Sequence, residues 1–155
     1  MCNSFLSTLL VCLLIGCSGA HTSQLDLDHI RYYQQITDKP YDDVLAELKI
    51  AITEQNFRIT SHSRVGKVIR ERGNVDFPDY DTIQFCNLTH AKTLLEISAH
   101  SIRHMPCSVV VYTENDQVIV KTKLLPTDSQ DPELNDFSQH INSMLRGIVD
   151  FAVEY

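Results

Sequence analysis

The chain has 155 residues, a formal net charge of −7 at pH 7 and a hydrophobic fraction of 43%. This length suits one domain with its own core. An acidic balance without basic clusters argues against nucleic acid and anionic lipid surfaces as partners.

The first 16 residues contain no charged side chain and are rich in Leu, Val and Ile. The apolar run is too short to span a bilayer, which needs about 20 residues, and it is typical of a signal peptide (residues 1–16). The run ends in Leu14-Ile15-Gly16-Cys17, which resembles the lipobox of bacterial lipoproteins. In those proteins cleavage before the Cys leaves a thiol that carries a lipid, so the resemblance implies lipidation of Cys17.

The residue directly after Cys17 is Ser18. In enteric-type bacteria an Asp at this position resembles a signal for retention in the inner membrane, and this chain lacks it. The expected location is therefore the outer membrane, facing the periplasm, with the lipid anchor as the only membrane attachment. Residues 17–28 are the expected lipidated N-terminus and polar tether, and residues 29–155 the expected domain. The alternative is an ordinary secretory signal cleaved near Ala20, which would give a soluble periplasmic or secreted protein.

The cysteines divide into two groups under this interpretation. Of the five in the chain, Cys2 and Cys12 leave with the signal peptide and Cys17 is acylated, so Cys86 and Cys107 remain. A lone pair in an oxidising compartment is usually a disulfide. Closing a loop of about 20 residues would stabilise the fold by roughly 3 kcal/mol in the chain-entropy model.

The first half of the domain has the pattern strand, helix, strand, short helix. Residues 30–37 and residues 57–62 alternate with period two and predict strands. Pro40 stands where a helix begins, and apolar residues at helical spacing predict that helix up to Ile52. Residues 65–73 predict a short helix that carries much of the basic charge.

The middle of the domain contains a strand followed directly by a helix. Residues 82–86 alternate, with Ile83 and Phe85 on one side, and predict a strand. Asn87 is a suitable N-cap for a helix over residues 88–99.

The end of the domain predicts a hairpin and a long helix. Two Val-rich runs, residues 108–112 and 118–121, are separated by a polar turn at residues 114–117. Asp131 followed by Pro predicts the start of a helix whose apolar stripe continues to Phe151. The expected fold class is α+β: one compact domain with a mostly antiparallel sheet, helices packed on it and a long C-terminal helix.

Residues 30–126 resemble the bacterial family called domain of unknown function 302. The residues that carry the resemblance are Ile83-Gln84-Phe85-Cys86-Asn87, Ala91 with Leu94-Leu95, and Met105-Pro106-Cys107 with Val109, Val111 and Tyr112. With Cys86 and Cys107, the chain resembles a two-cysteine branch of this family. The resemblance implies a compact α+β domain and no settled biochemical activity.

A cluster of potential ligands surrounds the cysteine pair. If the strand ending in Cys86 and the strand beginning after Cys107 are neighbours, the two cysteines meet at one end of the sheet. His90 lies one helical turn after Cys86, and His104 lies three residues before Cys107. Because thiolate and imidazole suit Zn²⁺ and Cu⁺, these four residues are a candidate ligand set for Zn or Cu, with haem as a further alternative.

Three interpretations of the pair stay open: a structural disulfide, a redox-active thiol pair, and a metal or haem site. The Cys-x-x-Cys spacing of redox motifs is absent. Cys86 nevertheless precedes a predicted helix N-terminus, where the helix dipole favours the reactive thiolate.

No residue is predicted to be catalytic, because the Gly-rich phosphate loop, Gly-x-Ser-x-Gly and His-Glu-x-x-His are all missing. We therefore expect a binding or accessory module of the cell envelope, without a cofactor, rather than an enzyme. The expected partner is a small ligand, in a pocket near Phe85 and Tyr112, or an envelope protein. A homodimer is a further alternative.

Overall fold

The computed structural model describes residues 32–154. The predicted signal peptide, Cys17 and the whole tether lie outside these residues, so those predictions stay predictions. Within the described part of the chain, no helix is both long and apolar enough to cross a membrane.

Five strands form one sheet. They are β1 (Tyr32–Thr37), β2 (Arg58–Arg64), β3 (Tyr80–Cys86), β4 (Cys107–Glu114) and β5 (Gln117–Lys123). Their order in the sheet is β1-β5-β4-β3-β2, and every neighbouring pair is antiparallel. The structure confirms the predicted α+β class with its antiparallel sheet.

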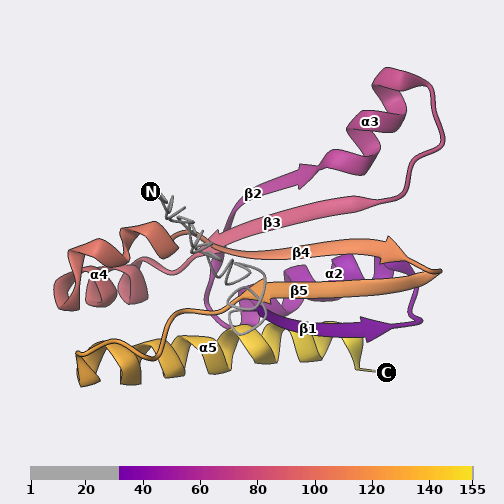
Figure 1. The fold of residues 1–155 in the computed structure, drawn as a ribbon. Helices are drawn as coiled ribbons and strands as arrows, with labels where there is room; N and C mark the ends of the chain where they lie inside the picture. Colours follow the sequence, from indigo (N-terminus) through magenta and orange to yellow (C-terminus); the bar gives the residue numbers. More distant parts are fainter. Residues whose placement is uncertain (1–31, 155) are drawn as a thin grey trace, which may run out of the picture.

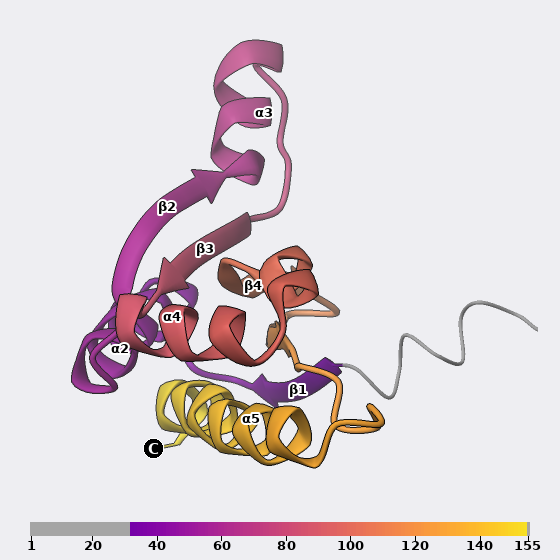
Figure 2. The same ribbon diagram turned by 90° about the vertical axis from the view of Figure 1, so that its left-hand side faces the viewer.

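Five helical segments accompany the sheet: α2 (Tyr41–Glu54), α3 (Val65–Gly73), α4 (Leu88–Ile97), the 3₁₀-helix η1 (Ala99–His104) and α5 (Pro132–Val153). The long helices α2 and α5 pack against each other on one face of the sheet. Helix α4 lies beyond the end of the sheet, near the start of α5, whereas α3 extends away from the sheet (Figures 1 and 2).

The predicted helix boundaries have the local causes that the sequence indicated. The Asp131 side chain accepts hydrogen bonds from the backbone N–H groups of Glu133 and Leu134 at 3.0 and 3.4 Å, with Pro132 at the first position. Asn56 follows α2 with a φ of 58°, the left-handed conformation that Asn tolerates at helix ends. These contacts satisfy backbone groups that a helix end leaves unpaired.

The core lies between the sheet and the two long helices. In β3 the side chains of Ile83 and Phe85 are fully buried, while Thr82 and Gln84 between them are partly exposed. This alternation follows from the period of two in a strand, which turns one face toward α2 and α5. The other large, fully buried side chains include Leu48, Ile52, Val109, Val111, Val120, Leu145 and Ile148.

One segment differs from the expectation. The helix predicted over residues 88–99 ends at Ile97, because Ser98 adopts an extended conformation with φ −150° and ψ 108°. The chain then forms the 3₁₀-helix η1, which the sequence patterns did not predict. This short helix carries the chain from α4 back to the start of β4.

Candidate functional site

An apolar pocket lies at the end of the sheet where β3 ends and β4 begins. It has an empty volume of about 350 Å³, including its open mouth. Helix α4, η1, the loop after β5 and the first half of α5 supply its walls. The lining residues are Phe57, Cys86, Asn87, His90, Ala91, Leu94, His104, Met105, Cys107, Leu125, Phe137 and Ile141.

Both cysteines line this pocket. Cys107 is the register partner of Phe85, so Cys86 and Cys107 are offset by one residue on adjacent antiparallel strands. The predicted meeting of the pair at one end of the sheet is therefore confirmed. Both thiols are free in this structure, so the predicted disulfide is not formed in it.

The Cys107 thiol is less acidic than an ordinary cysteine thiol, because it is buried in the protein. Burial, followed by the neighbouring Cys86, raises the pKa of Cys107 to about 11. Both causes disfavour the thiolate, because a charge would be desolvated and would face a second thiolate. Cys107 is therefore a protonated thiol at neutral pH and a weak nucleophile.

The two predicted histidines line the same pocket from different elements. His90 is fixed at the start of α4, where Asn87 accepts hydrogen bonds from the backbone N–H groups of Thr89 and His90 at 2.9 and 3.1 Å. His104 comes from η1, and its Nε2 accepts a hydrogen bond from Arg103 Nε at 3.1 Å. The predicted N-cap role of Asn87 is thus confirmed.

The four predicted metal ligands share a pocket without converging on one point. Cys86, His90, His104 and Cys107 all line it. Within residues 32–154, however, no three His, Cys, Asp or Glu side chains lie close enough together to hold one metal ion. Binding of Zn²⁺ or Cu⁺ would require side-chain rearrangement, because these ions need ligand atoms at about 2.0 to 2.3 Å.

Aromatic rings surround the His90 imidazole. Its centroid lies 6.0 Å from that of Phe57, 6.1 Å from that of Phe137 and 5.9 Å from that of His140. Burial lowers the pKa of His90, and the nearby His140 lowers it further. The neutral imidazole is thus the form that suits the apolar pocket.

This lowered pKa makes the stability of the fold depend on pH. The stabilising contribution is fully present above the pKa of an unfolded His, about 6.5, and is lost as the pH falls through the folded-state value. We expect wild-type protein to lose more stability between pH 7.5 and 5 than His90→Gln, as measured by urea denaturation. The His140→Gln variant should lose less stability than the wild type over this pH range, because it lacks the charge that opposes protonation of His90. Equal losses in wild type and His90→Gln would contradict this assignment.

The structure separates Phe85 and Tyr112, which were predicted to line one pocket. Phe85 is fully buried on the helix-covered face, with its ring edge-on to Phe57 at 5.2 Å, and it does not line the pocket. Tyr112 points to the opposite face, where its ring stacks on that of Tyr80 at 6.0 Å. The reason is that side chains alternate between the two faces along a strand. Cys107 is the register partner of Phe85, and Tyr112 lies five residues, an odd number, further along β4 and so points to the other face.

Sequence reasoning missed the part of the pocket that α5 supplies. Phe137 and Ile141 belong to the apolar stripe that predicted the helix, and both line the pocket. The stripe shows that these side chains face the domain interior. It cannot show which turn extends beyond the sheet and faces α4, because that depends on how the helix is placed along the sheet.

Comparisons with known proteins agree with this fold. The model of the family described as Domain of unknown function DUF302 matches residues 33–152. The crystal structure of an uncharacterized conserved protein DUF302 from Bacillus stearothermophilus is similar, with a TM-score of 0.69 and 21% sequence identity, over 81% of this chain and 99% of that chain. No curated protein matches. The family match runs from β1 to α5, and the chain therefore belongs to the DUF302 family.

Proposed function

We propose that this protein is a binding module of the cell envelope, anchored by a lipid on Cys17, with the apolar pocket as the site for a small ligand. The observation that carries the proposal is the pocket itself. Its walls are predominantly apolar and aromatic side chains, with a few polar groups at the thiols, the imidazoles and Asn87. This combination is typical of small-molecule sites, where apolar walls supply affinity and few polar groups fix orientation.

The size and lining of the pocket favour a small, uncharged, flat or branched ligand. The empty volume of about 350 Å³ includes open solvent at the mouth, so the enclosed part of the pocket is small. Met105 lies at the pocket and is partly buried against the core. Its flexible thioether can adapt to ligands of different shape.

Filling the pocket should abolish ligand binding without unfolding the domain. Ala91 lines the pocket from α4, so Ala91→Phe places an aromatic ring in the space of the ligand. With the neutral fluorescent probe N-phenyl-1-naphthylamine, we expect saturable binding to the wild type and at least about a tenfold loss in the variant, equivalent to about 1.4 kcal/mol. Fluorescence titration measures both.

The matched control is Ala99→Phe, which adds the same ring at an exposed position of η1 outside the pocket lining. It should bind the probe as wild type does. Equal binding by Ala91→Phe and wild type would contradict the proposal, and so would equal losses in both variants. Circular dichroism of both variants should match the wild type.

We further propose that Cys86 and Cys107 form a disulfide in the oxidising cell envelope. The support is their position on adjacent strands in one pocket wall together with the usual fate of a thiol pair in that compartment. A bond there would tie the end of β3 to the start of β4 and fix that wall of the pocket. The alternative, favoured by the shared pocket of Cys86, His90, His104 and Cys107, is a soft metal site.

Intact mass of the exported full chain, purified without reductant, separates these two states and also tests the anchor. A disulfide predicts that iodoacetamide adds no mass until the protein is reduced. A metal site predicts that the thiols react only after a chelator is added, and free thiols react at once; either result would rule out the disulfide. A lipid on Cys17 predicts added acyl mass that is absent from Cys17→Ser; a mature chain without that mass would contradict the anchor.

A further inference from the structure

A second hollow of the surface differs from the apolar pocket in its chemistry. We name it the polar cleft: it lies between α2, α3 and the end of the sheet where β2 ends and β3 begins, and it has an empty volume of about 730 Å³. Four cationic side chains line it: Lys49, Arg64, Lys67 and Arg70. The chain as a whole has a net charge of −7, so this concentration of cations is a local departure from the average surface.

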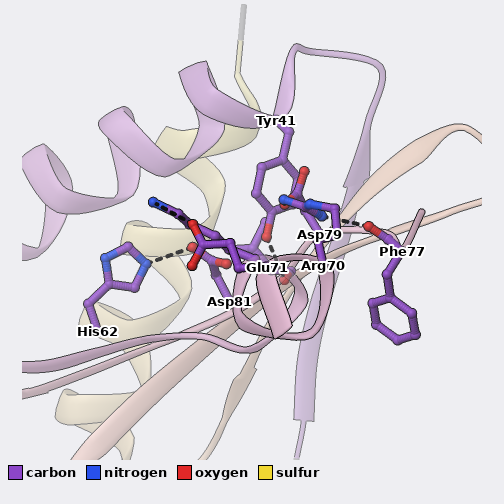
Figure 3. A network of polar contacts seen from close by, with 9 residues as sticks. Tyr41, His62, Arg70, Glu71, Phe77, Asp79 and Asp81 are labelled. Atoms are coloured by element: carbon purple, nitrogen blue, oxygen red, sulfur yellow. Dashed lines mark hydrogen bonds and ion pairs between the residues drawn. The ribbon is translucent and has the colours of Figure 1, made fainter. Parts of the chain in front are cut away.

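The polar cleft also contains carboxylates, and two of them already have side-chain partners (Figure 3). Asp79 Oδ1 accepts a hydrogen bond from Arg70 Nη2 at 2.5 Å, and Arg70 Nη1 donates to the Phe77 carbonyl at 2.6 Å. Asp81 is 5% exposed, and its Oδ2 lies 2.7 Å from His62 Nε2. These two carboxylates are therefore held by the protein itself.

Two of the cations have no such partner. Neither Lys49 nor Arg64 forms an ion pair within residues 32–154. Lys67 forms only a long pair with Glu71, at 3.6 Å, and both of these side chains are at least half exposed. Asp42, the remaining carboxylate of the cleft, is exposed in the first turn of α2. Positive charge is thus available on the side of the cleft formed by α2 and the end of β2.

Two contacts give the polar cleft a fixed frame. The Tyr41 hydroxyl donates to the Val111 carbonyl at 3.0 Å, which ties the start of α2 to β4. Burial and the nearby Asp81 and Asp79 raise the pKa of Tyr41, so this hydroxyl stays a donor. At Gly66 a Cβ would lie 2.3 Å from the Pro78 carbonyl oxygen, so the start of α3 packs directly on the backbone before β3. The cations therefore project from anchored segments.

We propose that the polar cleft binds a small anion through a phosphate or carboxylate group, with Arg64 and Lys49 as its main contacts. Arg presents a planar set of donors that matches two oxygens of either group, and Lys adds a compact positive charge. Lys67 at the rim would add a third, weaker contact. The acids Asp79 and Asp81 also line the cleft, and they stay paired with Arg70 and His62.

Amide NMR of the exported full chain, labelled with ¹⁵N and kept in mild detergent, tests this proposal with two probes, inorganic phosphate and citrate. We expect saturable shifts at residues of the polar cleft with at least one probe, and no such shifts with sodium chloride at matched ionic strength. The probe that binds more tightly distinguishes a phosphate ligand from a carboxylate ligand. Shifts no larger than those caused by chloride would overturn the proposal.

Charge-removing variants locate the contacts. Arg64→Gln and Lys49→Gln should each raise the Kd of the bound probe by at least about tenfold, since a charge-assisted hydrogen bond is lost. The matched control is Arg58→Gln, which removes the same charge at an exposed position at the other end of β2. Equal weakening by Arg58→Gln would show general attraction by charge and overturn the assignment. Unchanged binding in both Arg64→Gln and Lys49→Gln would also overturn the assignment.

Discussion

Replacement of Phe85 by Ala is expected to lower the free energy of unfolding by about 3 to 5 kcal/mol. The ring is fully buried, and it contacts the Phe57 ring edge-on with 5.2 Å between centroids. Its removal leaves a cavity between the sheet and the helices, and both the lost burial and the cavity reduce stability. Urea denaturation followed by circular dichroism measures the change.

The control for this variant is Leu88→Ala, an apolar truncation at a side chain that is 82% exposed. It should change stability by no more than about 0.5 kcal/mol. Because Phe57 also lines the apolar pocket, Phe85→Ala should in addition weaken binding of the hydrophobic probe. A loss of stability below about 1 kcal/mol would contradict the central position of Phe85 in the core.

Oxidation of Cys86 and Cys107 to a disulfide is expected to raise the free energy of unfolding by about 3 kcal/mol. The bond would close a loop of about 20 residues that contains α4 and η1, and it would restrict the unfolded chain more than the folded one. Comparison of the oxidised and the reduced protein in urea, with alkylation to verify the redox state, measures this difference.

Cys86→Ser and Cys107→Ser are the matched controls, since each keeps a side chain of similar size and cannot form the bond. Neither variant should gain stability on treatment with oxidant. If oxidation of the wild type lowers stability, the thiols cannot join without distorting the fold, and the pair is not a structural disulfide. A gain in the free energy of unfolding close to zero would contradict the entropic contribution expected from the disulfide.

The sequence determined the secondary structure and its boundaries to a large extent. Period-two alternation identified β1, β2 and β3, and Val-rich runs around a polar turn identified β4 and β5. Helical spacing with the caps at Asn87 and Asp131 identified α4 and α5. These signals are local, because a cap or an alternation depends on residues within a few positions of one another. The meeting of Cys86 and Cys107 was expected on the condition that β3 and β4 are neighbours, and the structure meets this condition.

The sequence by itself thus determined most of the elements and the α+β class. Only the tertiary structure decided which side chains share a cavity. It assigned Phe85 and Tyr112 to opposite faces, added Phe137 from α5 to the apolar pocket, and brought Lys49 and Arg64 to one cleft. The physical reason is that strand register and the placement of helices along the sheet depend on contacts between residues far apart in the chain, which no local pattern encodes.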